Sequence, residues 1–220
     1  MLLIAIMRAG PLLVVALAAC DQPTPATPVL SMLHGVEVVA ASDRPSTAVT
    51  DRVGAGDPDC AADAYGGIEL AADVAPDPGI ETVLASYSRG VIVLGADGHR
   101  IASTPGFGCT GTRDELAAVE IVRTSFDAPV IAVAATSGGR RESSTWLALV
   151  AVGSTTHLDR LFVGEVERRD ETGTHPGEVR FVPGGLVYRH PTDGVTLWRY
   201  DAAARRYVPR GARANGYSEQ

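Results

Sequence analysis

Short apolar runs separated by turns rich in Gly, Asp and Pro dominate the chain from residue 67 onward. Runs of this length, with β-branched residues and turn signals at both ends, predict strands rather than helices. Twelve such runs are present, at residues 67–73, 81–88, 90–95, 100–104, 117–124, 129–136, 144–152, 158–167, 178–182, 185–189, 194–200 and 205–209. They fall into three groups of four, and this spacing predicts three four-stranded antiparallel meanders.

The predicted fold class is therefore all-β, with the meanders arranged either as a propeller-like array or as a sandwich. Three meanders are too few for the usual closed propeller, which has four to eight blades. A further short strand around residues 36–39 would complete a sandwich. One alternative within the second group stays open, because Thr112 and Glu115 before Leu116 also fit a helix capping box. That reading places a short helix at residues 113–122.

The N-terminal residues have the layout of a secretory signal. An apolar run at residues 11–19 follows Arg8, and two small residues, Ala18 and Ala19, precede Cys20. The run is shorter than the roughly 20 apolar residues that a spanning helix needs. We expect residues 1–19 to be a signal peptide, with translation starting at Met1 or at Met7.

The four residues Leu17-Ala18-Ala19-Cys20 resemble the lipobox of bacterial lipoproteins. The resemblance implies that residues 1–19 are removed and that Cys20 is acylated on its sulfur and on the new amino terminus. Two or more acyl chains hold a protein stably at a membrane, where one chain does not. The alternative is a plain secreted protein. Asp21 fits the inner-membrane retention signal of some Gram-negative lipoproteins.

The segment after the lipobox predicts a spacer. Three prolines between residues 20 and 28 favour an extended chain that cannot pack, and residues 42–66 are rich in Pro, Gly and Asp. The predicted organisation is therefore a lipidated N-terminus, tether and loop over residues 20–66, a β-rich domain over residues 67–211 and a flexible tail over residues 212–220.

The cysteine count fits this assignment. The chain has three cysteines, and using Cys20 for lipid leaves Cys60 and Cys109 as an even pair. An exported protein lies in an oxidising compartment, so we expect a Cys60–Cys109 disulfide. Two unpaired buried thiols are the alternative.

Charge excludes one class of partner. The formal net charge is −7, and all 19 basic residues are arginines spread along the chain. Nucleic-acid binding needs clustered cations, so no nucleic-acid partner is expected.

Residues 73–98 resemble the FG-GAP/VCBS type of propeller repeat, in which an Asp-rich turn that often holds calcium leads into a hairpin. Asp73, Asp77 and Glu81 match the first, fifth and ninth positions of that turn. Ala75 and Pro78 depart from the pattern, so a carboxylate ligand and a flexible glycine are missing. Calcium prefers six to eight oxygen ligands. These three residues are therefore only a weak candidate calcium site, and no metal or other cofactor is predicted.

Catalytic motifs are absent from the sequence: there is no G-x-S-x-G, H-E-x-x-H, C-x-x-C or Walker A pattern. The histidines have no metal-ligand spacing, although a site assembled across strands from His157, His175 and His190 remains an alternative; the other two are His34 and His99. A set of aromatic residues predicts either cross-strand pairs within a sheet or a recognition surface. These residues are Trp146, Tyr188, Trp198, Tyr200 and Tyr207.

The hypothesis from sequence is a non-enzymatic lipoprotein with a β-rich binding or scaffold domain in the cell envelope, facing the periplasm or the exterior. Its expected partners are the membrane, through the lipid anchor, and an envelope protein. The alternatives are an envelope hydrolase with a site built from dispersed turn residues, and a calcium-stabilised propeller-like module.

Overall fold

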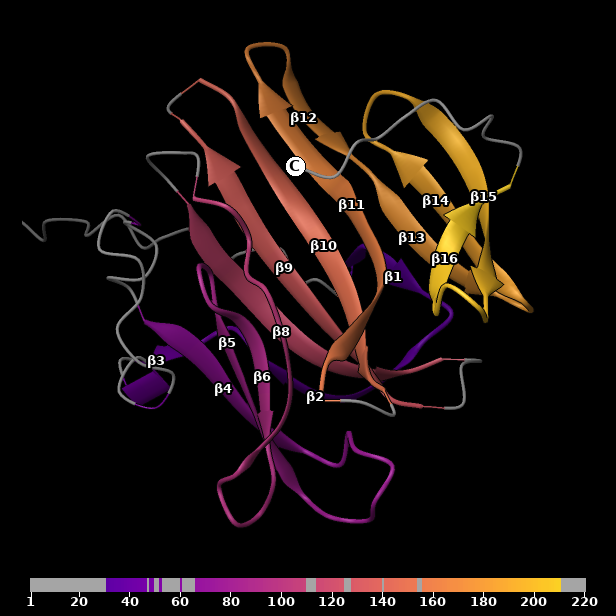
Figure 1. Ribbon diagram of the computed structural model, residues 1–220. Helices are drawn as coiled ribbons and strands as arrows, with labels where there is room; N and C mark the ends of the chain where they lie inside the picture. The colour runs from indigo at the N-terminus through magenta and orange to yellow at the C-terminus, as the bar shows by residue number, and fades with distance from the viewer. Residues whose placement is uncertain are drawn as a thin grey trace, which may run out of the picture.

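The structure is a computed structural model that describes residues 31–46, 48–49, 52, 60, 66–109, 114–124, 128–139, 141–153 and 156–210. The described residues form sixteen strands in three sheets, so the fold is all-β, as predicted (Figure 1). The signal peptide, Cys20, the proline-rich tether and the predicted tail at 212–220 lie outside the described residues. Within those residues, no helix is long and apolar enough to cross a membrane.

The first meander forms the N-terminal sheet, with strand order β3-β4-β5-β6-β7. Its strands are β3 (Pro45–Ser46), β4 (Gly67–Ala72), β5 (Glu81–Ser86), β6 (Gly90–Leu94) and β7 (Arg100–Thr104). Gly90 begins β6 with φ +79°, and its Cα lies against the backbone at the end of β7, where a Cβ has no room. Gly98 has a similar φ of +78° but faces open space.

The second meander forms the central sheet, with strand order β12-β11-β10-β9-β8-β2. Its strands are β2 (Glu37–Ser42), β8 (Glu115–Arg123), β9 (Val130–Gly138), β10 (Ser143–Val152), β11 (Leu158–Asp170) and β12 (Gly173–Pro176). The possible helix at residues 113–122 is wrong, because residues from Glu115 onward form β8. In this strand Val119 and Ile121 face one core while Ala118 and Val122 face another, a period of two that a helix does not have.

The third meander forms the C-terminal sheet, with strand order β1-β13-β14-β15-β16. Its strands are β1 (Leu33–His34), β13 (Glu178–Val182), β14 (Gly185–His190), β15 (Gly194–Asp201) and β16 (Arg206–Pro209). All pairs are antiparallel except that β1 runs parallel to β13.

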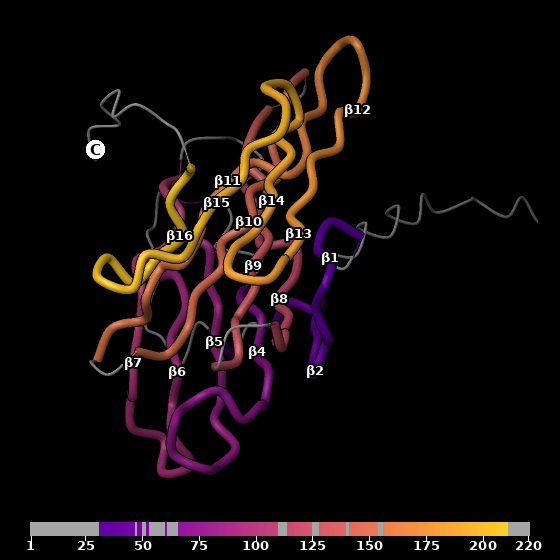
Figure 2. Tube along the Cα trace, turned by 90° about the vertical axis from the view of Figure 1, so that its right-hand side faces the viewer, coloured from indigo at the N-terminus to yellow at the C-terminus, as the bar shows by residue number. Residues whose placement is uncertain are grey.

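The sheets pack as layers, because both faces of the central sheet are apolar. One core, which includes Ile131, Val133 and Val150, lies between the N-terminal and central sheets. The other core, which includes Leu147 and Leu149, lies between the central and C-terminal sheets. Figures 1 and 2 show the C-terminal sheet against one side of the central sheet, with the N-terminal sheet below. The packing corresponds to the sandwich alternative.

Residues 33–46 form a strap that adds one strand to each sheet. β1 joins β13 in the C-terminal sheet, β2 joins β8 in the central sheet, and β3 joins β4 in the N-terminal sheet. The fold therefore begins well before residue 67, inside the segment predicted to be mostly tether and loop. Of this segment, only the strand near residues 36–39 was predicted.

Candidate functional site

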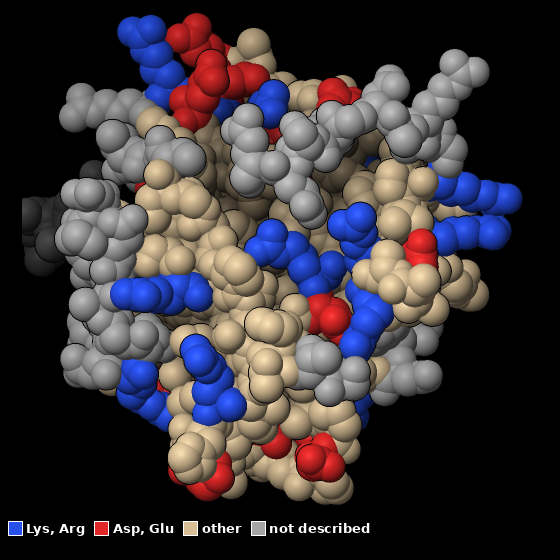
Figure 3. Space-filling model, viewed as in Figure 1, with Lys and Arg blue, Asp and Glu red and all other residues tan. Residues whose placement is uncertain are grey.

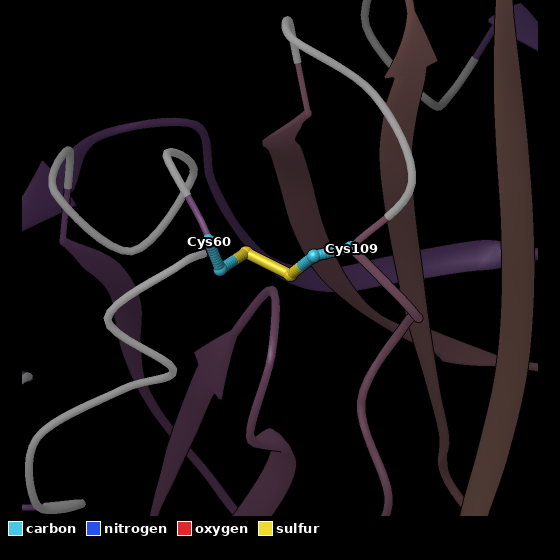
Figure 4. The surroundings of a disulfide bond; sticks show 2 residues. All are labelled: Cys60 and Cys109. Carbon is cyan, nitrogen blue, oxygen red and sulfur yellow. A yellow bond between two sulfur atoms is a disulfide. The ribbon is translucent and has the colours of Figure 1, made fainter.

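The predicted cysteine pair forms a disulfide. Cys60, in the segment between β3 and β4, is bonded to Cys109 after β7, with the two Cα atoms 5.6 Å apart (Figure 4). The bridge closes a loop, with a sequence separation of 49, that contains the whole β4–β7 meander. Cys60 is buried and packs with Tyr87 and Ala135, which ties the N-terminal sheet to the central one. The expected Cys60–Cys109 pairing is confirmed, whereas lipidation of Cys20 stays a prediction.

The weak calcium candidate contains a carboxylate with an internal role. Glu81 begins β5 and is buried, and its Oε2 accepts the backbone N–H groups of Val74 at 2.9 Å and Ala75 at 3.2 Å. Asp73 and Asp77 are exposed in the preceding turn. The described part of the chain contains no group of three or more His, Cys, Asp or Glu side chains that could hold a metal ion. Glu81 therefore caps the turn from within.

The histidines proposed as a possible site have separate partners. His175 on β12 lies 3.2 Å from Asp170 Oδ1 and 2.9 Å from the hydroxyl of Thr172. His190, at the end of β14, lies 3.3 Å from the carboxylate of Glu165. His157 forms a parallel bridge with Ser103 of β7. The remaining two, His34 on β1 and His99 in the turn before β7, are exposed.

Glu165 is the centre of a buried polar cluster that sequence reasoning missed. Its side chain is 1% exposed. Oε1 accepts the Ser144 hydroxyl at 2.5 Å and Arg168 Nε at 2.9 Å, and Oε2 accepts Arg168 Nη2 at 2.8 Å. The two Arg168 bonds form a bidentate pair, the strongest geometry for a guanidinium and a carboxylate. His190 Nε2 lies 3.3 Å from Oε2. Ser144, Glu165 and His190 come from three strands, β10, β11 and β14.

A β-bulge explains how Arg168 reaches Glu165. Residues three apart in a regular strand point to opposite faces of a sheet. Here Thr145 pairs with Glu167 and Trp146 pairs with Glu165, so Val166 is an extra residue in β11. Such a bulge re-aims the side chains beside it, and it brings the carboxylate and the guanidinium to the same side.

The hydrogen bonds of His190 fix its tautomer. Nδ1 accepts the backbone N–H of Thr192 at 3.1 Å and of Asp193 at 3.2 Å, so it carries no proton. The proton of the neutral ring is then on Nε2, the nitrogen that lies 3.3 Å from Glu165 Oε2. The carboxylate of Asp193 lies 3.4 Å from Nδ1, a pairing that would require protonation there and so the loss of both backbone bonds. The two backbone bonds, at 3.1 and 3.2 Å, therefore assign Nδ1 as the acceptor.

This arrangement differs from that of a serine-histidine-acid acyl-transfer site. In an acyl-transfer site a base accepts the proton of the serine and an acid orients that base. Here the carboxylate lies between the two groups: Ser144 donates to Glu165 Oε1, and His190 Nε2 lies 3.3 Å from Oε2. Tyr188 completes the cluster by donating its hydroxyl to the backbone carbonyl of Glu165 at 2.7 Å, and burial raises its pKa far above the usual value. The chemistry of the cluster is that of a satisfied structural network.

Four of the five singled-out aromatic residues lie in the interface between the central and C-terminal sheets. Tyr200 and Tyr207 are direct cross-strand partners, with ring centroids 5.5 Å apart. Tyr188 and Trp198 each meet Phe162 of β11 edge-on at 5.1 Å. Because the rings face inward, cross-strand pairing within a core describes them, rather than a recognition surface. Trp146 on β10 is the exception and is partly exposed.

The opposite face of the C-terminal sheet is directed outward and carries both apolar and basic side chains. Register places Arg189 beside Val195, Val187 beside Leu197, and Arg199 beside Val208. Val195 is 66% exposed. Figure 3 shows basic side chains projecting from the right-hand edge, where Figure 1 has β14 and β15. The sequence signal for this face is the alternation in 194–200, which assigned Val195 and Leu197 to one side.

Comparison with known proteins gives no relative: no family model, no curated protein and no solved structure matches the chain. The resemblance of residues 73–98 to a propeller repeat therefore remains a prediction from those residues alone, as does the lipobox.

Proposed function

We propose that this protein is a bacterial envelope lipoprotein, anchored to a membrane through Cys20, that presents its β domain as a non-catalytic binding or scaffold module. The anchor rests on the lipobox-like residues Leu17-Ala18-Ala19-Cys20 behind a secretory-type apolar run. The proposal of a single binding or scaffold domain is based on three layered sheets that the strap and a disulfide hold together.

The observation that carries the proposal is the pairing of Cys60 with Cys109. It accounts for two of three cysteines and leaves Cys20 as the odd one, directly after the small residues of the predicted cleavage site. A structural disulfide is typical of an oxidising compartment outside the cytosol. The same compartment is where a cleaved and acylated N-terminus would be found.

The geometry of the Glu165 cluster supports a binding module over a hydrolase. Ser144 donates to the carboxylate and not to a base, and each ring nitrogen of His190 already has a partner. A general base must reach the proton that it abstracts, and neither nitrogen is free to do so. A β domain without a free catalytic base in this cluster would then act through its outer surfaces.

The test is membrane fractionation of cells that express the wild-type chain, Cys20→Ser and a Cys60→Ser/Cys109→Ser control. The wild-type chain should be in the membrane fraction, with a mass that matches a chain starting at residue 20 plus acyl groups. After a wash in about 0.5 M salt, which screens electrostatic contacts but does not extract acyl chains, Cys20→Ser should be absent from the membrane fraction and the double variant should keep its anchor. Cys20→Ser that stays membrane-bound at the processed mass after this wash would refute the anchor.

A further inference from the structure

The outer face of the C-terminal sheet is built differently from the rest of this acidic chain. Four arginines point outward from its strands: Arg180, Arg189, Arg199 and Arg206. The acids in outward register are Glu178 and Asp201, which leaves the face with a net charge of +2 on a chain of net charge −7. Glu178 forms ion pairs with two of the arginines, each at 2.9 Å.

Apolar side chains lie between the basic ones. Val195 and Leu197 of β15 alternate with the inward-facing Trp198 and the exposed Thr196, and Val187 of β14 lies opposite Leu197. Val195 is the most exposed large apolar residue among the described residues, at 66%. A surface that combines an exposed valine and a half-buried leucine with arginine suits the headgroup region of a bilayer. There the arginine stems can lie along apolar groups while the guanidinium groups meet phosphates.

The route of the chain brings this face toward a membrane. β1 is the edge strand of the C-terminal sheet, so the described chain begins at the rim of this face. Twelve residues separate Cys20 from Leu33 of β1, and even a fully extended chain of that length spans at most about 45 Å. An anchor at Cys20 therefore keeps this edge of the sheet within that distance of the membrane.

We infer that the outer face of the C-terminal sheet docks on anionic phospholipid headgroups and so fixes the orientation of the domain on the membrane. The inference rests on the proposed lipid anchor for its setting, although the surface can bind anionic lipid without the anchor. Docking leaves the N-terminal sheet, on the other side of the central sheet, directed away from the bilayer and open to an envelope partner.

The test uses the full mature chain with Cys20→Ser, so that binding does not depend on acylation. Its sedimentation is measured with vesicles of phosphatidylglycerol in phosphatidylcholine and with vesicles of phosphatidylcholine alone. We expect binding only to the anionic vesicles, and loss of binding in about 0.5 M salt, where the Debye length falls to a few ångström. Equal binding to both vesicles, or to neither, would overturn the inference.

Charge-matched variants locate the surface. Arg199→Gln/Arg206→Gln removes two outward arginines of the C-terminal sheet, and Arg100→Gln/Arg123→Gln removes two exposed arginines of β7 and β8. Each arginine near an anionic surface contributes roughly fivefold to partitioning, so the first pair should lower the partition coefficient by roughly 25-fold. The second pair lies on strands of the other two sheets, outside the proposed face, and should change the partition coefficient by less than about twofold.

A similar loss in both pairs would mean that net charge alone governs binding, and the face would not be a docking site. A second outcome is that the chain does not bind vesicles but self-associates, and that Arg199→Gln/Arg206→Gln abolishes the self-association. This would assign the face to a second copy of the chain and overturn the inference. Thermal melting of each variant establishes that it is folded. Failure of the vesicle test leaves the fractionation result intact, and membrane retention of Cys20→Ser in cells leaves the vesicle result intact.

Discussion

Glu165→Gln isolates the role of the buried carboxylate, because glutamine keeps the size of the side chain and removes its charge. The native oxygens receive three hydrogen bonds of 2.5–2.9 Å, from Ser144 and from the two arms of Arg168. Whichever way the new amide is turned, its NH₂ group faces one N–H donor of Arg168. One arm of the bidentate pair is therefore lost in either orientation.

The size of the effect follows from what is lost and what can relax. A hydrogen bond to a charged group contributes about 1.5–3 kcal/mol to stability, and an unpaired buried donor adds to the loss. Arg168 is 42% exposed, so water can solvate the freed arm and limit the cost. We expect Glu165→Gln to lower the free energy of unfolding by about 2–3 kcal/mol, and the melting temperature by about 5–10 °C.

Urea denaturation followed by tryptophan fluorescence measures this change, since Trp198 packs against the neighbouring Phe162. Glu167→Gln is the matched control: it removes the same charge two residues along β11, from a side chain outside the cluster, and should cost less than about 0.5 kcal/mol. If the two variants are equally stable, the network around Glu165 does not stabilise the sheet interface, and the structural role assigned to it is wrong.

Three further measurements address the N-terminal sheet and the β11–β12 hairpin. Cys60→Ala/Cys109→Ala removes a cross-link with a sequence separation of 49 and should lower the free energy of unfolding by up to about 4 kcal/mol. Reduction of the wild-type chain should give the same midpoint in denaturant as this variant. A midpoint equal to that of the oxidised wild-type chain would contradict the prediction. Gly90→Ala should lower the stability of the fold by at least about 2 kcal/mol because a Cβ would collide with backbone. Gly98→Ala, at a similar φ but in open space, should lower it by only about 1 kcal/mol. Equal losses of stability in thermal melts would mean that φ alone matters. The pKa of Asp170 is lowered from 3.8 to about 2, first by a hydrogen bond from the Thr172 hydroxyl and then by one from the Thr172 backbone N–H. Because the folded-state pKa lies below the unfolded one, the contribution of Asp170 is complete above about pH 4 and is lost as the pH falls toward 2. Amide exchange in the hairpin should show this dependence, and Asp170→Asn should abolish it.

Local pattern was sufficient to predict the meanders. All twelve apolar runs are strands, and two of them, 100–104 and 178–182, have the predicted bounds. The turn residues between the runs end each strand for local steric reasons, so their positions can be predicted from the linear sequence. The grouping in fours also became the division into sheets, since consecutive strands joined by short turns pair with one another.

Pairing between distant segments could not be predicted from local pattern. β12 has the polar sequence Gly-Thr-His-Pro and is a strand only because β11 extends far enough to pair with it. The Glu165 cluster depends on a bulge and on register across two sheets, and no linear motif encodes either. The pairing of Cys60 with Cys109 was predictable because an expected oxidising compartment and the even cysteine count left by assigning Cys20 to lipid supplied a constraint from outside the local pattern.

The strap also sets an order for assembly. β1 is among the first described residues to be synthesised, yet within the described residues its strand partner is β13, which begins at residue 178. Long-range pairing of this kind is slow to form because the intervening chain must be organised first. The earliest described strand therefore pairs only after the last meander has been made, and the three layers close only once nearly the whole chain has been synthesised.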